Sequence, residues 1–258
     1  MSSVEEKHFI LPDETRELLE RYQYQDKWVH HYTKLQHYLD IIEQKQYRLT
    51  RCDLLEDPHE GDLIDEYIIK AIRSLPDSQK REHLFDSYLR FQNTRVELKN
   101  VYIGSFCRMP ESYLMWKAYG DNLTGGCISL KKKNPNDNRI KLVRVIYNDR
   151  SKKQLVKKII QLIFNSEFLG PDYEGIFSFI FESLRFIFKK NEYSGEMEIR
   201  VIYYDNARNN PDYHYIDLET LFDIKGTLGA RSPIETIGIN NGVEEHKSII
   251  ELRTKPTH

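Results

Sequence analysis

The chain has few cysteines and almost no net charge, and each scarcity excludes a class of protein. Its three cysteines stand far apart among 258 residues, without a Cys-x-x-Cys pair, so neither a zinc knuckle nor a disulfide framework is predicted. With 38 basic and 40 acidic side chains, the chain as a whole does not attract nucleic acid or an anionic membrane, although a local basic groove is left open. We therefore expect a cytoplasmic protein with reduced thiols in its core.

The chain also lacks a long apolar run. Its first residues, MSSVEEKHF, have neither the basic start nor the apolar segment of a signal peptide. The longest apolar-rich stretch, 176–188, is interrupted by polar residues and is too short to span a bilayer. Internal repeats, low-complexity segments and linkers are absent as well. We expect one domain over 1–258 with no membrane partner, and the sequence does not indicate an oligomeric state.

Helical and strand patterns are interspersed along the chain. The stretches 126–130 and 140–147 are predicted to pair as strands through the basic, turn-forming run 131–138. Asp77 is predicted to cap a helix, and Gly120 to end one in the left-handed conformation. Further strands are predicted at 28–33, 47–51, 101–107 and 197–204, and helices at 35–42, 63–91 (broken near Pro76), 111–119, 152–164 and 173–189. The fold class expected is α+β, with a mixed or antiparallel central sheet flanked by helices.

Four polar and aromatic stretches are candidates for chemistry, and the first is the strand 28–33. Side chains alternate along a strand, so His31 shares a face with Val29 and Thr33, whereas His30 shares the other with Tyr32. At most one of the two histidines therefore belongs to a given pocket. The alternative is that one histidine bonds a neighbouring carbonyl and the other is exposed.

The second stretch is Asp57-Pro58-His59-Glu60-Gly61, in which proline and glycine predict an ordered turn. Its two carboxylates either serve a site or cap the helix that follows. No second cluster stands at a spacing that would complete a metal site.

The third stretch runs from Ser105 to Gly120. Tyr113, Trp116 and Tyr119 recur at every third residue and drift across one helix face. Such a face either packs on the sheet as core or forms a wall on which a flat heterocycle stacks.

The fourth stretch is 193–200. On a strand, Glu196, Glu198 and Arg200 would point to one side. Two carboxylates beside a guanidinium are an arrangement that poises one carboxylate for chemistry, and an exposed ladder of salt bridges is the alternative.

Together and in this order, the four stretches resemble a bacterial and phage domain family of unknown function. Its members carry His-Tyr-Thr, then Asn-Asp-Pro-x-Glu, then Phe-Ser with Met-Trp-x-x-Tyr and Gly-x-x-x-Gly, and then Glu-x-Glu-x-Arg. The resemblance covers about residues 28–205. This sequence departs from the pattern in having Glu56 where asparagine is usual, Cys107 where serine is usual and Tyr193 where tryptophan is common.

More distantly, the chain resembles ADP-ribosyltransferases, which carry a histidine or arginine on the first strand, a tyrosine or serine region on a middle strand and helix, and a glutamate on a later strand. This resemblance implies that Glu198 is the catalytic glutamate that stabilises an oxocarbenium-like centre, while Glu196 orients or deprotonates the acceptor. It implies that His31 holds the nicotinamide ribose. The residues expected to contact NAD are His31, Tyr32, Glu60, Trp116, Tyr119 and Arg200.

The function expected is therefore transfer of ADP-ribose from NAD, as substrate, to a macromolecule, either nucleic acid or protein, by a toxin or phage-defence effector that needs no metal. One rival is a nuclease in which Mg²⁺ is held by carboxylates. Its ligands would be Asp57, Glu60, Glu196 and Glu198. The other rival is a noncatalytic module whose aromatic helix grips a base or a peptide.

Overall fold

The computed structural model describes most of the chain, and the structural statements that follow concern the described residues. These are 13–24, 27–55, 61–135, 140–166, 173–205 and 211–231, without the side chains of Asp13 and Ser183. None of the helices in these ranges combines the length and the apolar character that a bilayer crossing needs. The α+β class is confirmed, because an antiparallel sheet is present together with helices.

The chain folds as two compact units, each formed from three segments. The first comprises Met1–Gln23, Leu55–Leu98 and Val145–Asn191, and the second comprises Tyr24–Leu54, Lys99–Arg144 and Glu192–His258. The expectation of one domain over 1–258 stays a prediction.

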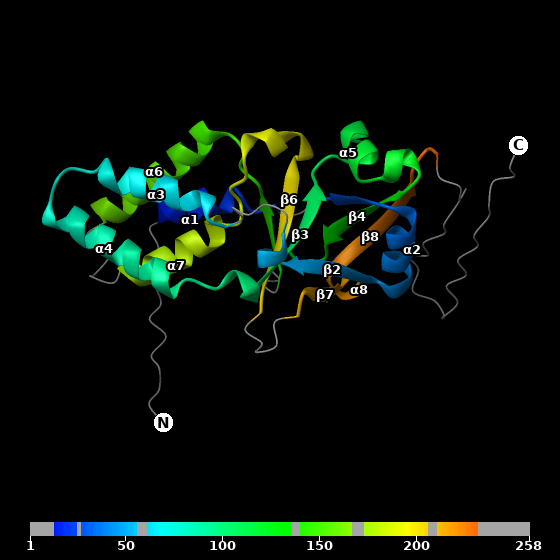
Figure 1. Ribbon diagram of the computed structural model, residues 1–258, viewed down its shortest axis with the longest axis horizontal. Coiled ribbons are helices and arrows are strands. Elements are labelled where there is room, and N and C mark those ends of the chain that lie inside the picture. Colours follow the sequence, from blue (N-terminus) through cyan, green and yellow to red (C-terminus); the bar gives the residue numbers. More distant parts are fainter. Residues whose placement is uncertain are drawn as a thin grey trace, which may run out of the picture. The chain divides into compact units, whose positions relative to one another are not determined.

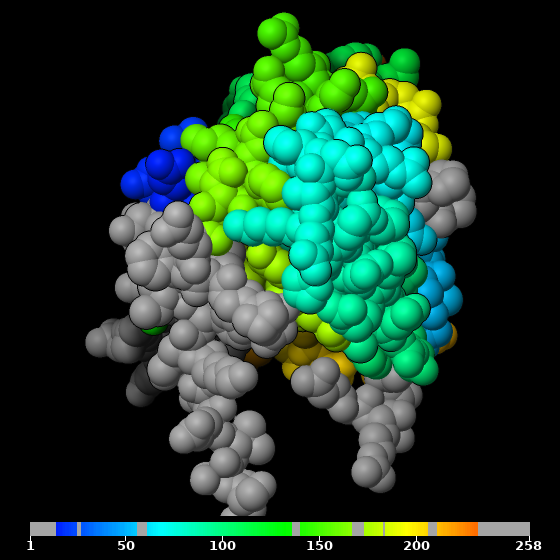
Figure 2. Space-filling model, turned by 90° about the vertical axis from the view of Figure 1, so that its left-hand side faces the viewer, coloured from blue at the N-terminus to red at the C-terminus, as the bar shows by residue number. Residues whose placement is uncertain are grey.

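The first unit is helical. Its helices are α1 (Asp13–Glu20), α3 (Leu63–Arg73), α4 (Gln79–Thr94), α6 (Asp149–Asn165) and α7 (Tyr173–Leu184). Helix α3 packs on α6 and on α4, and Figure 2 shows α3 and α4 (cyan to teal) beside α6 (green) on the surface. The expected cap of α4 was wrong by one residue: Ser78, rather than Asp77, accepts a hydrogen bond from the Arg81 backbone N–H. Ser78 is extended and immediately precedes the helix, which is the geometry that an N-cap requires.

The second unit contains an eight-stranded sheet whose pairings are all antiparallel (Figure 1). Its strands are β1 (Val29–Thr33), β2 (Gln46–Arg51), β3 (Val101–Cys107), β4 (Gly126–Lys132), β5 (Lys141–Arg144), β6 (Glu198–Tyr204), β7 (Tyr213–Asp217) and β8 (Phe222–Leu228). The main path is β5-β6-β3-β1-β4-β8, and β2 joins β3 and carries β7. Helices α2 (Leu35–Gln44), α5 (Tyr113–Ala118) and α8 (Leu218–Leu221) belong to the same unit, together with short 3-10 turns.

Strand β3 is where the sheet branches. One edge of β3 pairs with β6 along its whole length. The other edge is shared, because β1 pairs with it at Cys107 and β2 pairs with it at Tyr102 and Ile103. The segment 104–106 lies between these two pairings. The branch positions the candidate site.

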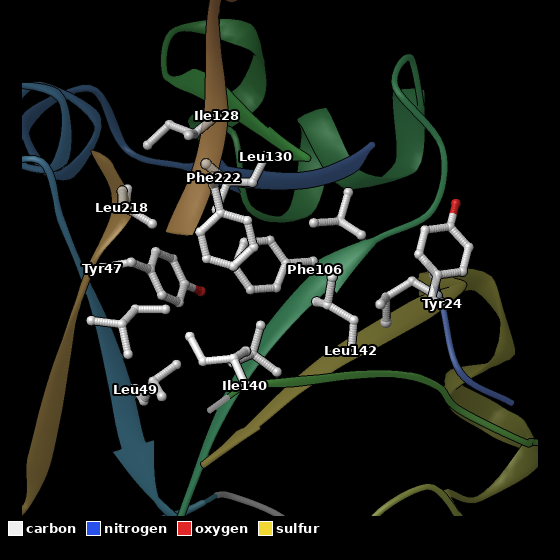
Figure 3. Packing of buried hydrophobic residues seen from close by; sticks show 14 of the residues in the cluster. Tyr24, Tyr47, Leu49, Phe106, Ile128, Leu130, Ile140, Leu142, Leu218 and Phe222 are labelled. Carbon is white, nitrogen blue, oxygen red and sulfur yellow. The ribbon is translucent and has the colours of Figure 1, made fainter. Parts of the chain in front are cut away.

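The core of this unit lies on the face of β3 that carries Phe106. Buried side chains from β1, β2, β4, β6 and β8 meet there, and Figure 3 shows Tyr47 and Leu49 of β2 directed toward Phe106. Burying one such side chain contributes about 1.5–3 kcal/mol to folding. Gly104 makes the approach of β2 possible, since a Cβ there would lie 2.6 Å from the Leu49 side chain and 2.8 Å from that of Tyr47.

One predicted strand pairing is wrong. Strands β4 and β5 do not form a hairpin with each other: β4 pairs with β1 and β8, and β5 pairs with β6. Turn-forming residues between two strands permit a hairpin but do not choose it over another neighbour. The buried Lys132 ammonium at the end of β4 donates to the carbonyl oxygens of Pro135 and Ile140.

Candidate functional site

The candidate site is built around Ser105, in the segment of β3 between its two pairings. Its backbone carbonyl oxygen lies 3.2 Å from His31 Nδ1 and 3.5 Å from the Tyr47 hydroxyl, which donates to it. Its own exposed side chain donates a hydrogen bond to Oε1 of Glu198 at 2.5 Å. One residue therefore links β1 and β2 to β6.

The partners of His31 determine its protonation. A carbonyl oxygen can only accept, so the contact with Ser105 requires a proton on Nδ1. Burial lowers the pKa of His31 to about 4, against the opposing effect of that same hydrogen bond. The ring is therefore neutral at physiological pH, and Nε2 carries a lone pair. The Tyr47 hydroxyl lies 3.1 Å from Nδ1, and burial raises the pKa of this tyrosine, so it too stays neutral.

Glu198 and Arg200 form a buried ion pair at the beginning of β6. Each residue is only 2% exposed. Arg200 Nε donates to Glu198 Oε1 at 2.9 Å, and a second guanidinium nitrogen lies 3.4 Å from Oε2. The guanidinium thus fixes the orientation of the carboxylate and compensates its charge, as a buried carboxylate requires. The two side chains share a face of β6, as the alternation along the sequence predicted.

Glu196 does not belong to that strand face, and the expectation that it would was wrong. It ends a 3-10 helix (Asn191–Glu196), and Met197, with a φ of 46°, separates it from β6. This left-handed residue breaks the alternation on which the expectation depended. Glu196 instead accepts a hydrogen bond of 2.9 Å from the hydroxyl of Tyr119, which is 47% exposed.

Tyr32 anchors α5 to the sheet. Its ring meets Trp116 edge to face at a centroid distance of 5.0 Å, in a cluster with Cys107, Met115 and Cys127. Its hydroxyl donates to the Met109 carbonyl oxygen at 2.8 Å and accepts from the Ser112 backbone N–H at 3.2 Å. The hydroxyl of Tyr32 therefore acts as both donor and acceptor, and these contacts give Tyr32 a structural role.

The aromatic helix departs from two expectations. Its three rings do not pack together on the sheet, since Tyr113 is 68% exposed whereas Trp116 lies against Tyr32. Gly120 is not left-handed: its φ is −85°, and the positive φ values follow at 121–123. Glycine is needed there for space instead, because a Cβ would lie 2.5 Å from the Trp116 ring.

The strand register places the expected residues on two faces of the sheet. Tyr32, Ser105, Glu198 and Arg200 share one face, and His31 points to the other. His30, on the first face, contacts the Ser129 hydroxyl at 2.8 Å. The structure thus connects His31 to Glu198 through Ser105, whose carbonyl group contacts His31 and whose hydroxyl group contacts Glu198. Glu60, with Asp57, Pro58 and His59, lies outside the described residues.

A pocket of about 340 Å³ lies beside His31, between β1, α2, β2 and β7. Its lining residues are mostly polar: His31, Thr33, His37, Asp40, Ile41, Gln44, Gln46, Tyr47, Arg48, Thr50 and Tyr215. Among these residues, only His31 and Thr33 belong to a stretch that was selected from the sequence. Ser105 was part of the third candidate stretch but was not assigned a role, and Tyr47 was not selected, because the contacts of both residues come from the branch in the sheet rather than from a local motif.

Metal ligation and thiol chemistry find little support in the described part of the chain. No group of three His, Cys, Asp or Glu side chains there is close enough together to hold a metal ion. The three cysteines are buried and free. Burial raises the pKa of Cys127 to about 12 and raises that of Cys107, so both thiols are protonated and poorly nucleophilic at neutral pH.

Comparison with known proteins gives one match. A family model described as a protein of unknown function (DUF2971) matches residues 115–201, about one third of the chain. This segment contains Trp116, Tyr119, Glu198 and Arg200, whereas His31 and Ser105 precede it. No curated protein and no solved structure matches the chain. Over the matched segment, the chain is similar to an uncharacterised domain family.

Proposed function

We propose that the chain is an ADP-ribosyltransferase that cleaves NAD beside Ser105 and Glu198 and transfers ADP-ribose to a macromolecule. The observation that supports this most is the connection of His31 and Glu198 through Ser105, by contacts of 3.2 and 2.5 Å. The three residues come from three different strands. A glutamate on a later strand is what the distant resemblance requires, whereas His31 points to the other face of the sheet and bonds only the Ser105 backbone carbonyl, so the expected contact of His31 with the nicotinamide ribose is not part of the proposal.

The chemistry explains why a fixed carboxylate is needed. When the bond between nicotinamide and the ribose C1′ breaks, nicotinamide leaves with the bonding electrons and positive charge develops at C1′ and the ring oxygen. A preorganised negative charge stabilises that centre without reorganisation. Glu198 can supply such a preorganised charge, because Arg200 and Ser105 hold the orientation of its carboxylate.

Ser105 would give the ribose access to Glu198. Its side chain is exposed while that of Glu198 is buried. After donating to Glu198, the serine oxygen can still accept a hydrogen bond. A ribose hydroxyl would therefore donate to Ser105 or replace it on the carboxylate.

Neighbouring residues would complete the reaction. The rings of Tyr119 and Trp116 offer surface on which nicotinamide can stack. The acceptor's nucleophilic atom attacks C1′ and loses its proton, and Glu196, partly exposed, is the general base we assign. A Mg²⁺ nuclease fits less well, since a divalent ion on Glu198 would sit beside the Arg200 guanidinium.

The test is release of nicotinamide from labelled NAD by the purified chain, with and without a mixture of nucleic acids and proteins as acceptors. Glu198→Gln keeps the size of the side chain but removes its charge, and we expect the rate to fall about 10²- to 10³-fold. The matched control is Glu192→Gln, at an exposed position of the 3-10 helix, which should react normally. Absence of release from the wild-type chain under all these conditions refutes the proposal. Cleavage of RNA or DNA with Mg²⁺ would support the nuclease instead.

A further inference from the structure

The pocket between β1, α2, β2 and β7 has the composition of a nucleotide site. We propose that it binds one nucleobase together with its attached phosphate. Its volume of about 340 Å³ is near the lower end of the ~300–1,000 Å³ range of small-molecule sites. The size suits one nucleotide unit rather than a dinucleotide.

The charges of the lining favour a ligand with a single anionic group. Among the lining residues that the structure describes, Arg48 and Asp40 are the only Arg, Lys, Asp or Glu side chains. Asp40 accepts a hydrogen bond of 2.8 Å from the Gln36 amide, so its charge is partly compensated. Arg48 can form paired hydrogen bonds with one phosphate group, as a planar guanidinium does well. A polyphosphate would find no second lysine or arginine in this lining.

The wall formed by β2 and β7 offers an aromatic platform. Arg48 lies opposite Tyr215 in the register, and its guanidinium stands over the Tyr213 ring, 4.2 Å from the centroid. Tyr215 is 53% exposed, while Leu49 and Ile216, from the opposite face of the same ribbon, are buried in the core. The exposed ring of Tyr215 is therefore not needed for core packing and is available for stacking, which contributes about 1–3 kcal/mol per base in proteins that bind single strands.

The remaining lining supplies hydrogen bonds without charge. Gln44 and Gln46 are exposed, and each amide both donates and accepts. Thr33 and Thr50 add hydroxyl groups, and the neutral His31 ring closes one side. Donors and acceptors beside an aromatic platform match the edge and the face of a nucleobase.

The choice of a nucleobase over another flat polar ligand, such as a sugar, rests on the proposed function. His31 lines the pocket and contacts the Ser105 backbone carbonyl, whereas the Ser105 hydroxyl and Glu198 lie on the other face of the sheet. The pocket is therefore separate from the proposed reaction centre, and with a nucleic acid as acceptor it would hold a unit of the strand other than the one that reacts. The same chemistry is also present in a free mononucleotide.

Binding to the full chain without NAD tests the inference. The ligands are the four ribonucleoside monophosphates, a single-stranded RNA and DNA of mixed sequence, and two ligands without a base, ribose 5-phosphate and glucose. We expect the ligands with a base to bind, as measured by calorimetry or fluorescence anisotropy. Tyr215→Ala and Arg48→Ala should each weaken binding about tenfold. Phe179→Ala and Arg150→Ala, at exposed positions outside the pocket, are the matched controls and should bind as the wild type does.

The outcomes separate the sources and the hypotheses. Tighter binding of a strand than of a mononucleotide identifies nucleic acid as the ligand, and equal binding identifies the free nucleotide. Failure of every nucleotide to bind at millimolar concentration, equal binding of ribose 5-phosphate, or full affinity in both pocket variants overturns the inference. Release of nicotinamide plays no part in this measurement. If the chain releases nicotinamide but binds no nucleotide, only the proposal of nucleotide binding is wrong. If it binds nucleotide but releases no nicotinamide, only the proposal of transferase activity is wrong.

Discussion

The hydroxyl of Ser105 donates a hydrogen bond of 2.5 Å to Glu198, although 93 residues separate the two in the chain. Ser105 is exposed and Glu198 is buried, so the serine is the part of this pair that a ligand meets first. The carbonyl group of the same serine accepts from His31 on the other side of the sheet. A substitution at Ser105 therefore separates the role of the hydroxyl from that of the carboxylate beneath it.

Ser105→Ala should lower nicotinamide release while the chain stays folded. The variant removes the donor from Glu198 but leaves the Arg200 ion pair and the backbone contact with His31 intact. The free energy of unfolding should fall by about 1 kcal/mol, the usual net contribution of one hydrogen bond. Thermal melts and release rates are measured together, and Ser105→Thr, which keeps a hydroxyl, should recover part of the rate. Unchanged release from the alanine variant would remove Ser105 from the mechanism.

Arg200→Ala should destabilise the chain strongly, because it leaves the Glu198 carboxylate buried without its guanidinium partner. Breaking a buried pair in this way costs about 3–5 kcal/mol. Adding Glu198→Gln to the variant removes the uncompensated charge and should restore part of the loss in urea unfolding. Lys45→Ala breaks an exposed pair with Glu219 and should cost less than about 1 kcal/mol. A small loss for Arg200→Ala would show that the pair is not a structural requirement.

The stability of the chain should depend on pH through His31. Burial lowers its pKa from the usual 6.5 to about 4 in the folded chain, so between these values the unfolded chain binds the extra proton. Stability is therefore fully present above about pH 6.5 and falls as the pH decreases toward 4. His30 and His214, whose pKa values burial also lowers, act in the same direction.

Comparison with a variant isolates the part that belongs to His31. His31→Asn keeps a donor for the Ser105 carbonyl but cannot titrate, so the fall in stability between pH 6.5 and 4 should be smaller. Urea unfolding at a series of pH values measures the slope. An equal slope in both proteins would contradict the assignment of a neutral, half-buried imidazole at this position.

Tyr32→Phe tests how α5 is attached to the sheet. The hydroxyl of Tyr32 bonds the Met109 carbonyl oxygen and the Ser112 backbone N–H, and its loss should cost about 1–3 kcal/mol. Hydrogen exchange of the amides of α5 should become faster, since Ser112 also caps this helix. Tyr113→Phe, on an exposed ring, should change neither property. Unaltered exchange in Tyr32→Phe would mean that ring packing alone holds the helix.

Local features could be predicted from the sequence, whereas the branch of the sheet could not. Strand β3 was predicted with its observed bounds because Val101–Cys107 is rich in β-branched and aromatic residues. The partner of β5 was predicted wrongly. Leu142 of β5 pairs with Val201 of β6, a residue far away in the sequence, and a turn-forming run between β4 and β5 does not indicate pairing with so distant a segment. Sequence patterns report periodicity within one element, and pairing between elements depends on the packing of the whole unit.

The same limit applies to the site. Glu198 and Arg200 were predicted on one face because alternation holds within β6, but Glu196 was placed with them because nothing local announces a left-handed Met197. Ser105 stood in a candidate stretch but without a predicted role, and Tyr47 stood in none. They become important only because β1 and β2 diverge from β3 and bring His31 to the Ser105 carbonyl.

Glu196 and Glu198 should fail in different ways, because they occupy different surroundings. Glu198 is buried in the ion pair, whereas Glu196 is partly exposed and accepts from Tyr119. If Glu196 serves only the acceptor, Glu196→Gln should lose transfer to the macromolecule but retain slow hydrolysis of NAD by water. Glu198→Gln should lose both, because each reaction passes through the same oxocarbenium-like centre. The assay compares nicotinamide release with and without acceptor, beside thermal melts that establish folding. Loss of both transfer and hydrolysis in each variant would show that the two carboxylates act together. The assignment of separate roles to Glu196 and Glu198 would then be wrong.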